Sequence, residues 1–243
     1  MQGAILTIGS LLWDDGTRAE WRREHLHIDR KICVKVPIGY GRRSQTRGNT
    51  FTMTFTLDGP AGQGVLVPCT EPTVNVGSLV AEAEALWSAE QPTASSPRIG
   101  AEWGCVGVLC RAETESAHLL QEWARHFRDI HTFAVSPVDE RGMLRIPWPV
   151  KATDGAPAEA DVVLATATKA EVVRPCAEEI ADAWLGQNKG HERYFFENVL
   201  HGIRTPDDGL IWKRIEEQGP CWLSNDAYTE AVTILRREAT AHV

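Results

Sequence analysis

Two stretches of the sequence, far apart along the chain, carry residue types that could bind an anion and move a proton. The first is the turn Gly9-Ser10-Leu11, which follows the apolar run Ile5–Ile8. A glycine and a serine at the end of a buried strand can offer two backbone N–H groups and a hydroxyl, with no bulky side chain in the way of a carboxylate. The same fragment also fits an ordinary strand-to-loop turn, so other residues must decide between the two interpretations.

Glu90 is the second candidate, because it falls on the apolar face of a predicted helix. In a helix over residues 75–90, Glu90 lies about 30° from the centre of the apolar stripe, whereas Glu82 and Glu84 project about 90–110° away from it. We therefore expect Glu82 and Glu84 on the solvated flanks. The stripe consists of apolar residues at i, i+3 and i+4 spacing, namely Val76, Leu79, Val80, Ala83, Leu86 and Trp87.

Periodicity alone leaves two interpretations of Glu90 open. Pro92 follows closely, so in one interpretation the helix end frays and the carboxylate lies in water. In the other, the carboxylate lies in a pocket and loses solvation, which raises its pKa. A raised pKa is what a general base or acid working near neutral pH needs.

The elements that would position these residues are strands early in the chain and helices late in it. Residues 50–57 alternate strictly between threonine and large apolar side chains, which predicts a half-buried strand. This order of elements predicts an α+β fold rather than repeated βαβ units. Further strands are expected at 32–37, 64–69, 103–110 and 161–168, and further helices at 117–127, 169–185, 191–200, 207–218 and 225–238.

Length and composition limit the possible functions. The chain has 243 residues, enough for a single domain over 1–243 with a large core. Its net charge of -8 argues against a nucleic-acid surface, whereas the arginines at 42, 43 and 47 favour a local anion site. No stretch resembles a membrane span or a signal peptide, so we expect a cytoplasmic protein without membrane contacts.

The six cysteines and eight histidines give no metal-binding spacing. The cysteines include no Cys-x-x-Cys pair and stand mostly in apolar surroundings, so we expect them to be reduced core residues. We therefore expect no metal site.

Several segments, taken in order, match the motifs of one known superfamily. Besides the Gly9-Ser10-Leu11 turn, they are the arginine-rich turn Ile38–Gly48, the segment Leu86–Glu90, the stretch Gly186–Tyr194 and the pair Gly202-Ile203. Together they resemble the gamma-glutamylcyclotransferase superfamily, especially its ChaC-like branch.

Two features depart from that family. The family usually has a tyrosine where this chain has Ile8, so Ile8 would shape a pocket without donating a hydrogen bond. Residues 113–157 match nothing in the family and are interpreted as an atypical insertion. This insertion, which contains Trp123 and Trp148, is either a lid or extra wall of the site or a surface embellishment with a packed tryptophan.

The resemblance implies a small mixed β-barrel surrounded by helices, with a C-terminal helical part. It also implies a reaction without a cofactor, in which the α-amine of a gamma-glutamyl peptide or amine attacks the γ-carbonyl. The products are 5-oxoproline and the released amine. Glu90 would act as general base and then general acid. The implied substrate-binding residues are Ile8, Gly9, Ser10, Leu11, Arg47 and Tyr194, although Tyr194 also fits a core position.

Two other classes of function stay open. One is a non-catalytic protein that binds gamma-glutamyl or other carboxylate ligands, and the other is a cysteine or serine amidohydrolase, which needs a base beside its nucleophile. The position of Glu90 distinguishes the first from the cyclotransferase. If its side chain points into a pocket beside the Gly9-Ser10 turn, the enzyme is favoured. The sequence makes no prediction of oligomeric state.

Overall fold

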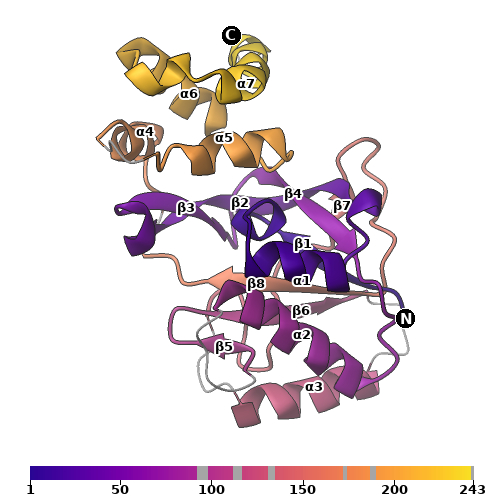
Figure 1. Ribbon diagram of the computed structural model, residues 1–243. Helices are drawn as coiled ribbons and strands as arrows, with labels where there is room; N and C mark the ends of the chain where they lie inside the picture. Colours follow the sequence, from indigo (N-terminus) through magenta and orange to yellow (C-terminus); the bar gives the residue numbers. More distant parts are fainter. Residues whose placement is uncertain (92–97, 112–116, 131–134, 172–173, 187–189, 242–243) are drawn as a thin grey trace.

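A mixed eight-stranded sheet runs through the middle of the molecule, and helices lie above and below it in Figure 1. This computed structural model describes residues 1–91, 98–111, 117–130, 135–171, 174–186 and 190–241. The strands are β1 (Gly3–Thr7), β2 (Ile32–Ser44), β3 (Thr50–Phe55), β4 (Ala61–Pro68), β5 (Gly100–Ala101), β6 (Gly104–Cys110), β7 (Val150–Lys151) and β8 (Val162–Thr168).

The strand order is β3-β2-β4-β1-β8-β6-β5, and β7 pairs with β2. The central strand β1 runs antiparallel to β4 and parallel to β8, with Ile5 opposite Leu164 in the parallel pair. All five residues of β1 are buried, because the strand has a hydrogen-bonded neighbour on each side and covered faces. The turn after β1 is therefore held in place by a buried strand.

The helices form two groups. Helices α4 to α7 gather beyond the β3–β2–β4 part of the sheet, whereas α2 and α3 lie near β8, β6 and β5 (Figure 1). Helix α1 packs against α2. The helices are α1 (Thr17–His25), α2 (Val76–Glu90), α3 (Ala117–Ile130), α4 (Ala177–Leu185), α5 (Arg193–Leu200), α6 (Asp208–Gln218) and α7 (Thr229–Ala241).

The sheet is not closed into a barrel. Its hydrogen-bonded order begins at β3 and ends at β5, and within the described residues these two edge strands do not pair with each other. Closure would need both edges to hydrogen-bond in a consistent stagger. Instead, β5 has only two residues, and β3 comes close to β8 without pairing with it. The predicted α+β class is confirmed, whereas the small mixed β-barrel that the resemblance implies is not confirmed, because the sheet is open.

Strand β3 is more deeply buried than its alternating pattern predicts. Residues 50–55 are all buried, including the three threonines, so the predicted half-buried strand has two covered faces. Helix α4 packs against this strand and β8 approaches it, which covers the threonines as well as the phenylalanines. An alternating sequence pattern shows which face of a strand carries polar side chains, but not whether that face is exposed. In β3, the threonine face lies against other parts of the protein instead of solvent.

The described part of residues 113–157 packs onto β6. Val108 exchanges backbone hydrogen bonds with the segment 142–144, at 2.9 and 2.8 Å. Trp123 is fully buried, and the indole N–H groups of Trp123 and Trp148 each donate to a backbone carbonyl. This part of the segment thus adds a layer over one end of the sheet.

No helix in the described ranges combines the length and the apolar character needed to cross a lipid bilayer.

Candidate functional site

The turn at the end of β1 is shaped by a close approach between two distant segments. A Cβ atom at residue 9 would lie 2.9 Å from the phenolic oxygen of Tyr194, so the ring can occupy this position only because residue 9 is glycine. The short 3₁₀ helix Ser10–Leu12 follows, and no turn or loop hydrogen bond among the described residues uses the N–H of Ser10 or Leu11. These N–H groups are thus available to a ligand.

Helix α1 braces this turn with two arginines. The Arg22 guanidinium donates to the carbonyl oxygens of Leu11 (2.6 Å) and Asp14 (2.7 Å). Arg18 donates to the Ser10 hydroxyl at 2.6 Å and forms an ion pair with Asp14 at 2.9 Å. The position of the Ser10 side chain is therefore set by α1 as well as by β1.

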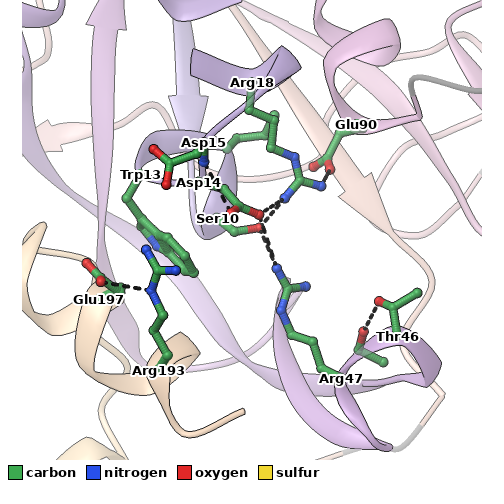
Figure 2. Close-up of polar contacts among 12 residues, drawn as sticks. Ser10, Trp13, Asp14, Asp15, Arg18, Thr46, Arg47, Glu90, Arg193 and Glu197 are labelled. Atoms are coloured by element: carbon green, nitrogen blue, oxygen red, sulfur yellow. Dashed lines mark hydrogen bonds and ion pairs between the residues drawn. The ribbon is translucent and has the colours of Figure 1, made fainter. Parts of the chain in front are cut away.

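Arg18 also joins the turn to the end of α2. Its second terminal nitrogen donates to the Glu90 carboxylate at 2.9 Å, and its Nε donates to the carbonyl oxygen of Ala89 at 3.3 Å. Arg47 approaches from the other side and donates to the Ser10 hydroxyl at 3.2 Å. Figure 2 shows Ser10 between the two guanidinium groups, with Glu90 on the far side of Arg18. Ser10 and Glu90 thus belong to one hydrogen-bonded network.

Glu90 is the last residue of α2, and its side chain does not fray into solvent. Only 17% of the side chain is exposed. Burial raises the pKa of this carboxyl group above its ordinary value, while the positive charges of Arg18, Arg42 and Arg47 act in the opposite direction. Because loss of solvation is the larger effect, Glu90 has the environment expected of the pocket interpretation.

A small cavity of about 80 Å³ lies at this network. The residues predicted from the sequence as catalytic or substrate-binding all line it: Ile8, Gly9, Ser10, Leu11, Arg47, Glu90 and Tyr194. The remaining lining residues are Leu6, Thr7, Arg18, Arg42, Thr52, Met53, Thr166 and Thr168. Segments from β1, α1, β2, β3, α2, β8 and α5 therefore meet at one place, as the sequence alone could not show.

Tyr194 is both a core residue and a wall of this cavity. It is 4% exposed, and its hydroxyl oxygen accepts a hydrogen bond from the backbone N–H of Met53 at 3.2 Å. The Arg47 guanidinium lies 5.0 Å from the centre of the Tyr194 ring. Burial raises the pKa of Tyr194, so its phenol stays protonated. The two interpretations of this residue are thus compatible.

The threonines that line the cavity differ in what their hydroxyls contact. Thr7 donates to the carbonyl oxygen of Val65 at 3.1 Å, and Thr52 donates to that of Arg42 at 3.2 Å. The hydroxyl of Thr166 is buried and has no hydrogen-bond partner among the described residues. Because a buried hydroxyl is normally paired, Thr166 has hydrogen-bonding capacity left for a bound molecule.

Among the lining residues that the sequence analysis did not assign to the site, Arg18, Arg42 and Thr166 have polar groups suited to binding a ligand. Asp14, in the turn before α1, and Arg18 in α1 are four residues apart and form an ion pair, and this spacing is the sequence signal that could have pointed to Arg18. Residues 38–44 of the predicted arginine-rich turn 38–48 belong to strand β2 instead, and nothing in the sequence of that stretch separates Arg42 from Arg43. Thr166 belongs to an apolar strand, and its lack of a partner appears only in the folded molecule.

Glu82 corrects one prediction about α2. The sequence placed it on a solvated flank, yet its side chain is only 13% exposed. The reason is α1, which packs against this side of α2 and brings His25 to 3.0 Å from the Glu82 carboxylate. Burial raises the pKa of Glu82, and His25 opposes that shift.

A larger hollow of about 460 Å³ lies elsewhere, beside β6 and the segment 141–147. Its lining is mostly apolar and contains two arginines but no carboxylate, cysteine, serine or histidine. It shares no lining residue with the smaller cavity, and no described residue of 113–157 lines the smaller cavity. The described part of the insertion therefore forms neither a lid nor a wall of the candidate site.

The cysteines offer no nucleophile at this site. All six are free, and none lines the cavity. Burial raises the pKa of Cys105 and of Cys110 to about 12, as is typical of core residues. The sequence predicted core positions for the cysteines, but Cys176 and Cys221 are exposed. Within the described ranges, histidine, cysteine and acidic side chains form no group of three or more that could hold a metal ion.

No protein-family model matches this chain. No curated protein matches it either.

Proposed function

We propose that this protein is a gamma-glutamylcyclotransferase of the ChaC-like type, which converts a gamma-glutamyl peptide or amine to 5-oxoproline and releases the amine. The observation that carries this proposal is the meeting of Glu90 and the Gly9-Ser10 turn in one small cavity. The sequence resemblance supports it as well. Neither the open sheet nor Ile8 conflicts with the chemistry, because the reaction depends on the groups around the cavity.

Ser10 is suited to holding an oxygen of the substrate. Its hydroxyl oxygen accepts hydrogen bonds from both Arg18 and Arg47, which uses its two lone pairs. The hydroxyl hydrogen remains, and no described residue accepts it. A carboxylate or carbonyl oxygen of the substrate would take this hydrogen bond together with the N–H groups of the turn.

Glu90 is suited to moving the proton that the reaction must transfer. The α-nitrogen forms a bond to the γ-carbon, and the bond from that carbon to the leaving nitrogen breaks. Glu90 would take a proton from the α-nitrogen and return it to the leaving nitrogen, so no water or cofactor is consumed. Burial shifts the pKa of Glu90 toward neutral pH. Near its pKa, one carboxyl group can both accept and donate a proton.

A serine nucleophile is less well supported. No described histidine or carboxylate accepts a hydrogen bond from the Ser10 hydroxyl, and a serine without an adjacent base is a weak nucleophile. The binding-protein alternative retains support from one contact, because the Arg18–Glu90 ion pair gives Glu90 a structural partner.

The test is release of 5-oxoproline from glutathione and gamma-glutamyl-alanine by the parent protein, Glu90→Gln and Glu84→Gln. Glu84 is the matched control, because it lies on the same helix and does not line the cavity. We expect turnover by the parent and by Glu84→Gln, with a loss of at least about 100-fold in Glu90→Gln. Absence of turnover in the parent, with measurable binding of the same compounds, would instead establish the binding protein.

A further inference from the structure

Arg42 is the arginine of the cavity that forms no ion pair with the residues that the structure describes. Arg18 pairs with Asp14 and Glu90, both at 2.9 Å, and Arg47 lies 3.6 Å from Asp14. In the part of the chain that the structure describes, no hydrogen bond or ion pair involves the Arg42 guanidinium. The cavity lining thus holds three guanidinium groups and one carboxylate, Glu90, with Asp14 beside it, and Arg42 is the guanidinium that forms no ion pair among the described residues.

The backbone and one aromatic ring hold Arg42 in this position. A bulge in β2 shifts the register, so Tyr40 pairs with Met53 while Arg42 pairs with Thr52. Adjacent residues of β3 point to opposite faces, so the bulge turns Arg42 to the face opposite that of Tyr40. The guanidinium then stacks on Trp103, 4.7 Å from the ring centre. A stacked guanidinium keeps its N–H edge free for an anion.

Arg43 provides a contrast within the same strand. It is exposed, stacks on Phe51 at 4.1 Å and donates to the backbone carbonyl of Asn49. It does not line the cavity. Two neighbouring arginines therefore have similar aromatic contacts, and only Arg42 faces the candidate site.

We propose that Arg42 binds a carboxylate on the leaving group of the substrate and so selects gamma-glutamyl amino acids or peptides over uncharged gamma-glutamyl amides. This inference rests on the proposed cyclotransferase function. A gamma-glutamyl amino acid carries one ammonium and two carboxylates and has a net charge of minus one, which offsets the positive charge of Arg42. A gamma-glutamyl alkylamide has no net charge. The Gly9-Ser10 turn takes the α-carboxylate, and Arg42 takes the second one.

The experiment compares kcat/KM for gamma-glutamyl-alanine and gamma-glutamyl-ethylamide, which differ in the leaving-group carboxylate. We expect the parent protein and Arg43→Met to prefer gamma-glutamyl-alanine by about tenfold or more, as a lost charge-assisted hydrogen bond predicts. In Arg42→Met the preference falls to about one, with most of the change in KM. The ratio cancels any effect of Arg42 on the ionisation of Glu90, since both substrates need the same base.

The outcomes separate the two proposals. If the parent releases 5-oxoproline from none of glutathione, gamma-glutamyl-alanine and gamma-glutamyl-ethylamide, the proposed function fails and this inference fails with it. If the parent turns over both compounds with equal kcat/KM, or if Arg42→Met keeps the parent's ratio, only the inference is overturned. Should Arg42→Met fail to fold, the inference is tested by the ratio of kcat/KM for the two compounds in the parent and in Arg42→Lys. Arg42→Lys keeps the charge and is expected to keep a preference for gamma-glutamyl-alanine.

Discussion

Glu90 is the residue at which opposing electrostatic effects meet. Burial raises its pKa, and three arginines lower it, of which Arg18 has the largest effect. Arg18 therefore favours the ionised form of Glu90. In the proposed cyclotransferase, Glu90 must be ionised before it can accept a proton, so the rate of that reaction should fall on the acid side of the pKa of Glu90.

Replacing Arg18 should move the acid limb of the pH–rate profile to higher pH. Arg18→Met removes a nearby positive charge, so the pKa of Glu90 rises further and the base is lost at a higher pH than in the parent. The measurement is kcat/KM for glutathione against pH in both proteins. Arg23→Met is the control, because Arg23 lies on the same helix but is exposed. An acid limb that stays in place or moves to lower pH would contradict this role of Arg18.

At the level of elements, the site depends on how α1 and α2 lie against each other. Two side-chain pairs join them: Arg18 with Glu90 and His25 with Glu82. The second pair lies away from the cavity and has one oxygen of Glu82 buried without a partner. Such a carboxylate is costly to keep ionised in the folded state.

Glu82 should make folding stability decline as the pH rises. Its folded-state pKa lies above the ordinary value of 4.5, so the folded protein holds this proton more tightly than the unfolded chain does. The stabilisation that comes from this tighter proton binding by Glu82 is fully present below about pH 4.5. It is lost as the pH rises through the folded-state pKa. We expect Glu82→Gln to become more stable relative to the parent as the pH rises across this range, because glutamine stays uncharged.

Urea unfolding of Glu82→Gln, Glu84→Gln and the parent at several pH values checks this prediction. Glu84→Gln makes the same change of charge on the same helix and should follow the parent. If Glu82→Gln ran parallel to the parent at every pH, the folded-state pKa of Glu82 would not differ from that in the unfolded chain.

Periodicity located the elements whose apolar pattern is strong and missed those that lack one. Helix α2 was predicted to within one residue, because six apolar side chains share its stripe. Helix α1 was not predicted, because Trp21 is its only buried residue among nine. Helix α4 begins at Ala177 rather than at residue 169, after Pro175. The missed helix is also the one that supplies Arg18, so the gap in the fold prediction and the gap in the site prediction have the same cause.

The whole molecule determines whether distant residues meet. The sequence could propose Ser10, Glu90 and Tyr194, but their meeting depends on β1 lying at the centre of the sheet and on α5 packing against the turn after it. Barrel closure could not be predicted, because periodicity reports which strands exist and does not report whether two edges pair.

The contact between Gly9 and Tyr194 should appear as coupling between two distant substitutions. Gly9→Ala places a Cβ 2.9 Å from the Tyr194 hydroxyl, whereas the next ring atom is 3.7 Å away, an ordinary contact. The loss of stability in Gly9→Ala should thus be smaller by about 1 kcal/mol in a protein that already carries Tyr194→Phe. Urea unfolding of the parent, both single variants and the double variant measures this coupling. Additive changes would show that the turn adapts without the ring.

The parallel pairing of β1 with β8 also has a consequence for the order of events during synthesis. Ile5 leaves the ribosome well before its partner Leu164, which is made 159 residues later. Until then, β1 can pair with β4 alone, and its other edge stays open to solvent or to other chains. Pairing between residues so far apart in sequence is slow to form. The nascent chain is therefore most exposed to misassociation between the completion of β4 and the arrival of β8.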